Sequence, residues 1–157
     1  FEFFNEMSRQ KGVNCFSAGG KSNIIRQLEQ SQNEEGTILV IVDGAAFGSE
    51  MKDISECIKT QGNIVLYAPE SFEWLLLSTK EIPEVNVETV LQNPEEYIDS
   101  KEYVSWERYF TDLLIESTSK NFIWAYSKKR LTKAYFAPRI VNAVKIIMKL
   151  VDWEKLF

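Results

Sequence analysis

The sequence predicts an α/β protein with a short parallel β-sheet flanked by helices, followed by a helical C-terminal part. Residues 37–42 form a mostly β-branched run without alternation, which is typical of a strand buried on both faces of a parallel sheet. Strand-like and helix-like stretches alternate through residues 1–80, the order expected of right-handed β–α–β connections. We therefore divide the chain into an α/β core (1–80), an acidic connector (81–100) and a helical extension (101–157).

Three strands are expected in the core, at residues 13–16, 37–42 and 63–68, and we expect them to be mutually parallel. Apolar residues at helical spacing predict helices between and after them. These helices are expected over 3–11, from Ser22 or Asn23, over 51–60, after the capping residue Ser71, from Glu102, and near Pro138.

Composition limits the classes of function. With 157 residues, 45% of them apolar and 26% charged, the chain has ordinary globular composition for one domain. No apolar run reaches the roughly 18 residues of a membrane-spanning helix, and two cysteines favour a reducing, cytoplasmic location. The lack of histidine excludes Ser-His and Cys-His catalysis and histidine-containing zinc sites. The abrupt helical start at Phe1 suggests a fragment of a larger polypeptide.

Charge is distributed unevenly along the chain. Residues 1–119 hold 9 basic and 21 acidic side chains, a net charge of −12, whereas residues 120–157 hold 9 and 2, a net charge of +7. Such polarity indicates that the basic end faces either a polyanion or the acidic part of the same chain.

A glycine-rich turn precedes the second predicted helix. Gly19, Gly20, Lys21 and Ser22 resemble the end of a phosphate-binding loop, in which backbone amides and a lysine hold phosphates. Cys15 stands where that motif has its first glycine, so a tight strand-to-helix turn is the alternative. In either case Lys21 is a candidate phosphate contact.

Acidic residues follow two of the predicted strands. Asp43 comes directly after 37–42, and Glu70 and Glu73 follow 63–68. Because the carboxyl ends of parallel strands share one edge of the sheet, these carboxylates can hold a hard cation such as Mg²⁺ together. The structural alternatives are an Asx turn at Asp43 and a favourable helix-dipole position for Glu73.

The pattern of residues 1–80 resembles the TOPRIM domain, a Rossmann-like fold, and most of all the version in OLD-family nucleases and related bacterial defence proteins. Four elements carry the resemblance: Phe3 and Phe4 in the first helix, the glycine turn at 16–23, the strand Val-Ile-Val-Asp-Gly at 40–44, and Pro-Glu-Ser-Phe-Glu-Trp-Leu-Leu at 69–76.

The resemblance implies a magnesium-dependent nuclease in which Asp43 and Glu73 are catalytic and Asp43, Glu73 and Glu70 hold the metal. The sequence departs from the family at two places. The first-strand glutamate would precede Phe1, and Ala45 stands at the second acid of the Asp-x-Asp motif, with Glu50 the next acid along the chain.

The basic C-terminal segment is a candidate nucleic-acid contact. Lys128, Lys129, Arg130 and Lys133 are interleaved with aromatic residues, and cations with aromatics suit phosphate contacts and base stacking. The alternative is that the aromatics belong to the core and the cations cover acidic neighbours.

Two hypotheses follow. In the first, the chain is a TOPRIM-type nuclease module of a larger antiviral defence or repair protein, with DNA as substrate and a further domain such as an ATPase. The fragment alone is then expected to be weak or inactive. In the second, it is a non-catalytic TOPRIM-like module that binds nucleic acid or protein.

Overall fold

A computed structural model describes residues 1–31, 35–44, 50–83, 85–93, 96 and 105–149, and all that follows concerns these residues. The chain is an α/β protein with a two-stranded parallel sheet formed by β1 (Ile38–Ile41) and β2 (Ile64–Tyr67). Ile38 lies opposite Ile64, and Ile41 lies opposite Tyr67. The strands expected at 37–42 and 63–68 are therefore confirmed, including their parallel direction.

The strand expected at residues 13–16 is wrong, because this segment has no regular secondary structure. A cavity of about 720 Å³ is lined both by residues 13–18 and by β1. The segment therefore does not lie against β1, and a β-like sequence cannot form a ladder without a neighbouring strand. Gly12, at φ +69°, provides the turn that leads into it from α1 (Glu2–Arg9).

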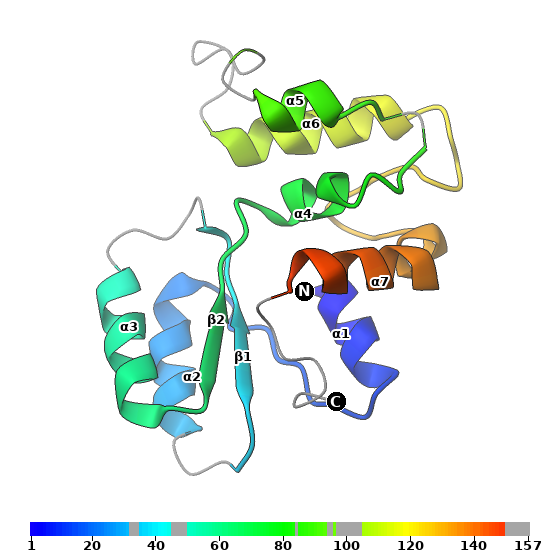
Figure 1. The fold of residues 1–157 in the computed structure, drawn as a ribbon. Helices are drawn as coiled ribbons and strands as arrows, with labels where there is room; N and C mark the ends of the chain where they lie inside the picture. The colour runs from blue at the N-terminus through cyan, green and yellow to red at the C-terminus, as the bar shows by residue number, and fades with distance from the viewer. Residues whose placement is uncertain (32–34, 45–49, 84, 94–95, 97–104, 150–157) are drawn as a thin grey trace.

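Two helices cover one side of the sheet: α2 (Ile24–Gln30), which follows the 3₁₀ turn η1 (Lys21–Asn23), and α3 (Glu50–Gln61) (Figure 1). They contribute to a small apolar cluster around Leu28, Val40, Val42 and Ile64. The helix expected over 51–60 is present as α3. Burial of these apolar side chains holds this face of the sheet against α2 and α3.

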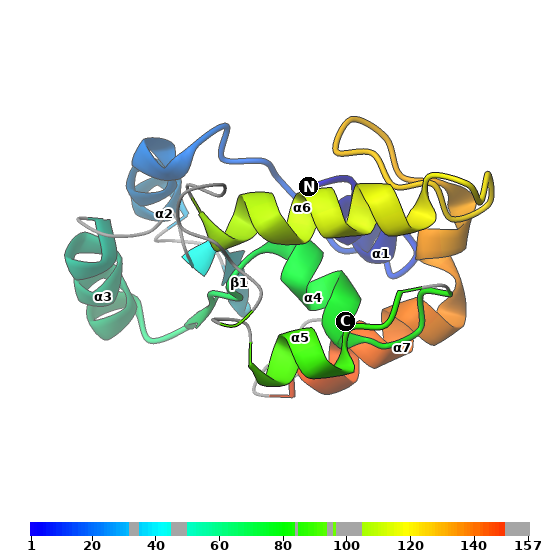
Figure 2. The same ribbon diagram turned by 90° about the horizontal axis from the view of Figure 1, so that it is seen from above.

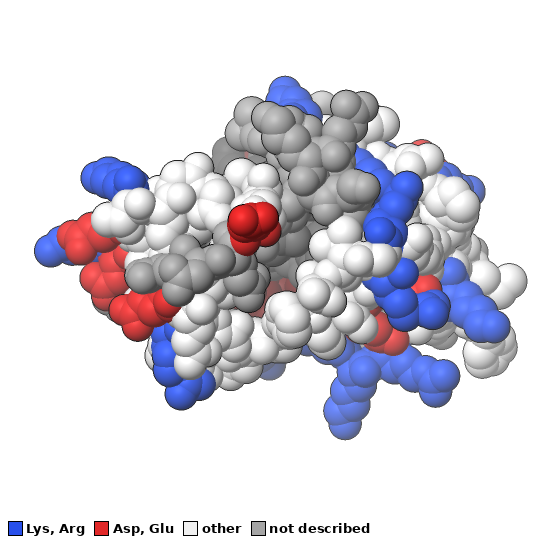
Figure 3. Space-filling model, turned by 90° about the horizontal axis from the view of Figure 1, so that it is seen from below, with Lys and Arg blue, Asp and Glu red and all other residues white. Residues whose placement is uncertain are grey.

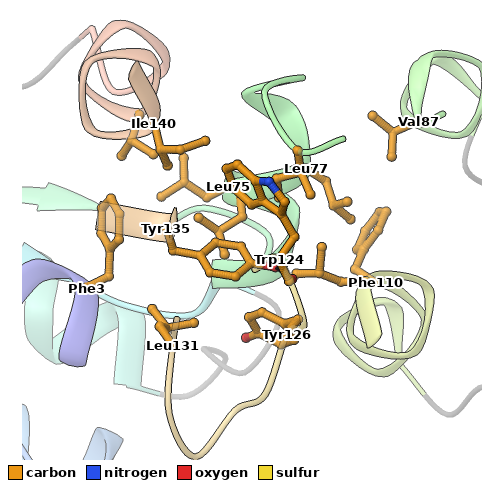
Figure 4. Packing of buried hydrophobic residues seen from close by; sticks show 14 of the residues in the cluster. Phe3, Leu75, Leu77, Val87, Phe110, Trp124, Tyr126, Leu131, Tyr135 and Ile140 are labelled. Atoms are coloured by element: carbon orange, nitrogen blue, oxygen red, sulfur yellow. Dashed lines mark hydrogen bonds between the residues drawn. The ribbon is translucent and has the colours of Figure 1, made fainter. Parts of the chain in front are cut away.

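A larger core lies on the other side of the sheet and joins the N-terminal and C-terminal parts of the chain. Its elements are α1, α4 (Phe72–Ser78), α5 (Glu88–Gln92), α6 (Trp106–Thr118), η4 (Lys133–Phe136) and α7 (Pro138–Ile147). Figures 1 and 2 both place α4 beside α6. Figure 4 shows aromatic and aliphatic side chains from these elements meeting around Tyr135, which is fully buried.

Local sequence signals explain where these helices begin. Ser71 caps α4 by accepting a 3.0 Å hydrogen bond from the Trp74 amide, and Ser105 caps α6 in the same way. Pro138 occupies the first turn of α7, where its missing amide hydrogen costs nothing. In the part of the chain that the structure describes, no helix has the length and apolar character needed to cross a membrane.

Candidate acidic pocket and basic loop

The chain segments that leave the two strands are held together by backbone hydrogen bonds. The Val42 amide donates to the Tyr67 carbonyl at 3.0 Å, and the Gly44 amide donates to the Pro69 carbonyl at 2.7 Å. A Cβ atom at position 44 would lie only 2.7 Å from the Pro69 carbonyl oxygen. The glycine after Asp43 is thus required by close approach of two backbones, which fixes Asp43 next to the start of α4.

Asp43 and Glu73 line the same pocket, which has a volume of about 210 Å³. Glu107 from α6 and Tyr126 and Lys128 from the loop 119–132 also line it. The acidic pocket, as we call it, therefore combines the carboxyl end of the sheet with the helical extension. Its remaining lining residues are Phe1, Glu2, Phe3, Phe72 and Leu131.

Glu73 is the most enclosed acid of this pocket, with only 4% of its surface exposed. Its Oε1 accepts a 2.6 Å hydrogen bond from the Tyr126 hydroxyl and lies 3.7 Å from the Lys128 ammonium. Burial, followed by the hydrogen bond to Glu73, raises the pKa of Tyr126, so its hydroxyl stays a donor. A buried carboxylate is tolerated here because both a hydroxyl and a cation meet it.

Lys128 lies among the carboxylates of the pocket. Its Nζ atom is 2.5 Å from Oε1 of Glu107, in addition to its contact with Glu73. Burial alone would lower the pKa of Lys128, but the hydrogen bond to Glu107 and the charges of Glu73, Glu107 and Asp43 outweigh it, and the pKa is raised. The lysine is therefore charged and takes the position of a counter-ion.

The acidic pocket differs from the predicted metal site in its members. Glu70 is half-buried and is not among the residues that line the pocket. Ala45, which stands at the second acid of the family's motif, lies outside the described residues. Glu50 forms a 3.3 Å ion pair with Lys21, the candidate phosphate contact of the glycine turn.

The carboxylates of the pocket suit Mg²⁺ in kind, since hard cations prefer oxygen ligands. Their number and placement fit less well. Within the described ranges, no group of three or more acidic or cysteine side chains is arranged to hold a metal ion. Two of these carboxylates, Glu73 and Glu107, form ion pairs with Lys128 in this conformation.

The predicted basic cluster separates into two kinds of residue. Lys128 faces the acidic pocket, whereas Lys129, Arg130 and Lys133 are exposed and form no ion pair with any described residue. Figure 3 shows mostly basic side chains on the side of the lower face where α1 and α7 lie. Three of the interleaved aromatics, Trp124, Tyr126 and Tyr135, belong to the core.

Sequence reasoning missed two residues of the pocket, Glu107 and Tyr126. Glu107 lies in the first turn of α6, which accounts for an acid there without any function. Tyr126 is one of the aromatics interleaved with the basic residues, and it is buried with its hydroxyl bonded to Glu73. No local pattern links either residue to Asp43, because the contact depends on how the helical extension packs.

Comparison with protein-family models, with curated proteins and with solved structures found no match to this chain.

Proposed function

We propose that residues 1–157 form a TOPRIM-type module that acts on DNA phosphodiesters within a larger defence or repair protein. The observation that carries this proposal is that Asp43 and Glu73 line one pocket at the carboxyl end of parallel strands. This edge is where α/β sheets usually place ligands, since the loops that follow the strands meet there. The fold analogy supplies the reaction class, and the pocket supplies the residues.

In this proposal Asp43 and Glu73 are the protein's ligands for a Mg²⁺ ion, with Glu70 nearby in sequence. The ion, when bound, would neutralise charge on the phosphodiester and activate a water molecule. Glu73 would have to exchange its contacts with Tyr126 and Lys128 for the metal. Ala45 stands where the family has a second acid, so residues 1–157 by themselves are expected to be weak or inactive.

The test of this function uses the longest natural polypeptide that contains residues 1–157. Cleavage of supercoiled plasmid would be measured with Mg²⁺ and with EDTA, for the wild type, Asp43→Asn and Glu73→Gln. Glu29→Gln, a change at an exposed acid of α2, is the matched control. We expect cleavage only with Mg²⁺, lost in the first two variants and kept in the control. Unchanged cleavage in Asp43→Asn and Glu73→Gln would refute the assignment.

A second candidate is a non-catalytic module that binds nucleic acid or protein. It is favoured by one observation: Lys128 and Tyr126 satisfy Glu73 within the chain itself. A buried carboxylate that already has a cation and a hydrogen-bond donor beside it does not need a metal ion as its partner.

Metal titration separates the two candidates. Calorimetry would measure Mn²⁺ and Mg²⁺ binding to the wild type and to Lys128→Met, which removes the ammonium but keeps the length of the side chain. Binding at millimolar metal or below, strengthened in Lys128→Met and lost in Lys128→Met/Asp43→Asn, supports the nuclease module. An absence of binding in the wild type and in Lys128→Met supports the second candidate.

A further inference from the structure

The most exposed large apolar side chain among the described residues is Phe122, with 94% of its surface accessible, and its neighbour Ile123 is 67% exposed. They lie in the loop 119–132, between α6 and η4. These two adjacent side chains leave apolar area in water, and contact with a partner would remove that area from water. Neither residue takes part in the acidic pocket.

The backbone of this turn is held in place by several hydrogen bonds. The Trp124 amide donates to the Asn121 carbonyl at 3.0 Å, and the Ile123 amide donates to Asn121 Oδ1 at 3.1 Å. The Thr132 hydroxyl donates to the Ile123 carbonyl at 2.6 Å, which brings the two arms of the loop together. Phe122 is thus presented on a defined turn, which lowers the entropic cost of a contact.

The turn is also fixed from below by the core. Trp124 is buried, packs edge-to-face against Tyr135 with ring centroids 5.5 Å apart, and accepts a 2.7 Å hydrogen bond at its carbonyl from the Tyr135 hydroxyl. Two residues away along the chain, Phe122 points out of that core. The Trp124 ring therefore packs in the core, whereas the Phe122 ring faces solvent and is available to a partner.

Basic residues occur on both arms of the loop that carries Phe122. Lys120 precedes Phe122 by two residues, and Arg130 and Lys133 flank Thr132, which bonds to Ile123. Lys129 lies next to Arg130. All four are exposed and make no ion pair within the described parts of the chain. The combination of a free aromatic face with unpaired cations matches a partner that has both phosphates and accessible bases.

We infer that Phe122 and the cations Lys120, Lys129, Arg130 and Lys133 form a binding surface for single-stranded DNA. A base stacks on the Phe122 ring and the neighbouring phosphates contact the cations. Duplex DNA offers the phosphates but keeps its bases stacked, so it cannot use the ring. Two apolar side chains give only a weak hold on a lipid surface, whereas one aromatic ring suffices for a stacked base.

This inference rests on the proposed function for the choice of DNA as the partner, and it deepens that function by naming the strandedness of the DNA. Its test measures binding in EDTA, without cleavage. A chain that binds single strands but never cleaves would refute the nuclease and leave the surface intact. If the full polypeptide cleaves DNA but its Phe122 variant binds single strands as well as the wild type does, the binding surface is refuted and the nuclease is supported.

The experiment measures the fluorescence anisotropy of a labelled 20-nucleotide oligo(dT) and of a matched hairpin duplex, with Phe122→Ala, Phe122→Trp and Phe16→Ala. Phe16 is another exposed phenylalanine, in the segment before α2, and serves as the matched control. Loss of one stacking contact, worth about 1–3 kcal/mol, should weaken oligo(dT) binding by roughly 5- to 150-fold in Phe122→Ala. Phe122→Trp and Phe16→Ala should bind like the wild type, and duplex binding should change little.

The cations are tested by salt dependence. Lys129→Gln/Arg130→Gln/Lys133→Gln should reduce the slope of log affinity against log salt by about 2, at roughly 0.7 for each single-strand phosphate released. Three results would overturn the inference: wild-type binding too weak to detect at low salt, equal oligo(dT) affinity for Phe122→Ala and wild type, or equal losses on single strand and duplex. Binding to anionic vesicles is measured in parallel. If Phe122→Ala weakens binding to the vesicles but not to oligo(dT), the inference is overturned in favour of a membrane contact.

Discussion

The hydroxyl of Tyr126 donates a 2.6 Å hydrogen bond to Oε1 of Glu73, a residue 53 positions earlier in the chain. This contact joins the loop of the helical extension to the first turn of the helix that follows β2. Both partners are buried, with 7% and 4% of their surfaces exposed. The acidic pocket is therefore formed by tertiary packing between the two halves of the chain.

Tyr126→Phe should destabilise the fold by about 1–3 kcal/mol, because it leaves a buried carboxylate oxygen without its donor while keeping the ring. Unfolding in urea, followed by circular dichroism, measures the change. Tyr67→Phe, at a partly buried tyrosine of β2, is the control and should cost less than the Tyr126 change. Equal effects of the two variants would mean that the hydrogen bond to Glu73 contributes little.

Lys128→Met should destabilise the chain by about 1–2 kcal/mol. This is less than the roughly 3–5 kcal/mol for one partner of a fully buried pair, because the Lys128 side chain is 47% exposed. The neighbouring exposed residue gives the control, Lys129→Met, which should lie within about 0.5 kcal/mol of the wild type. If both variants have the same urea midpoint, Lys128 is not the counter-ion of the pocket.

Stability should fall in alkaline solution. The pKa of Tyr126 is raised on folding by burial and by Glu73, so the folded state keeps its proton while the unfolded tyrosine ionises near pH 10. The contribution is therefore complete below about pH 10 and is lost as the pH rises further, by about 1.4 kcal/mol per pH unit. Urea unfolding from pH 8 to 11.5 measures this, and the slope above pH 10 should be reduced in Tyr126→Phe.

Gly44→Ala should destabilise the fold by about 1–3 kcal/mol, because the added Cβ would lie 2.7 Å from the Pro69 carbonyl oxygen and separate the two strand exits. The change also displaces Asp43 relative to Glu73. Thermal unfolding gives the stability, and hydrogen exchange of the backbone amide at position 44 reports whether its bond to the Pro69 carbonyl survives. A variant as stable as the wild type would show that this approach is not tight.

The local sequence predicted the elements that depend on local chemistry. The β-branched run of β1, the Ser71 cap of α4 and Pro138 at the start of α7 all act within a few residues. Residues 13–16 show the limit of this reasoning, because a strand also needs a neighbour, and the neighbour is a matter of topology.

The acidic pocket was predicted only in part, for a similar reason. Asp43 and Glu73 follow adjacent strands, so the shared edge of the sheet could be anticipated. Glu107, Tyr126 and Lys128 reach the pocket through packing of the helical extension, which no spacing in the sequence encodes. The exposed Phe122 could not be distinguished from the buried aromatics around it, since aromatics at helical spacing usually belong to the core.

Among the residues that the structure describes, the sheet consists of β1 and β2, so the backbone amides of β1 point alternately toward β2 and away from it. The bonds from the Ile38 amide to Asn63 and from the Val42 amide to Tyr67 fix the alternation of the parallel ladder. Val40 and Val42 therefore donate toward β2, and the amides of Leu39 and Ile41 point away from it. In deuterated solvent the amide hydrogens of Val40 and Val42 should exchange far more slowly than those of Leu39 and Ile41. Exchange rates along this one strand would therefore show, residue by residue, which of its two edges is hydrogen-bonded to a neighbour.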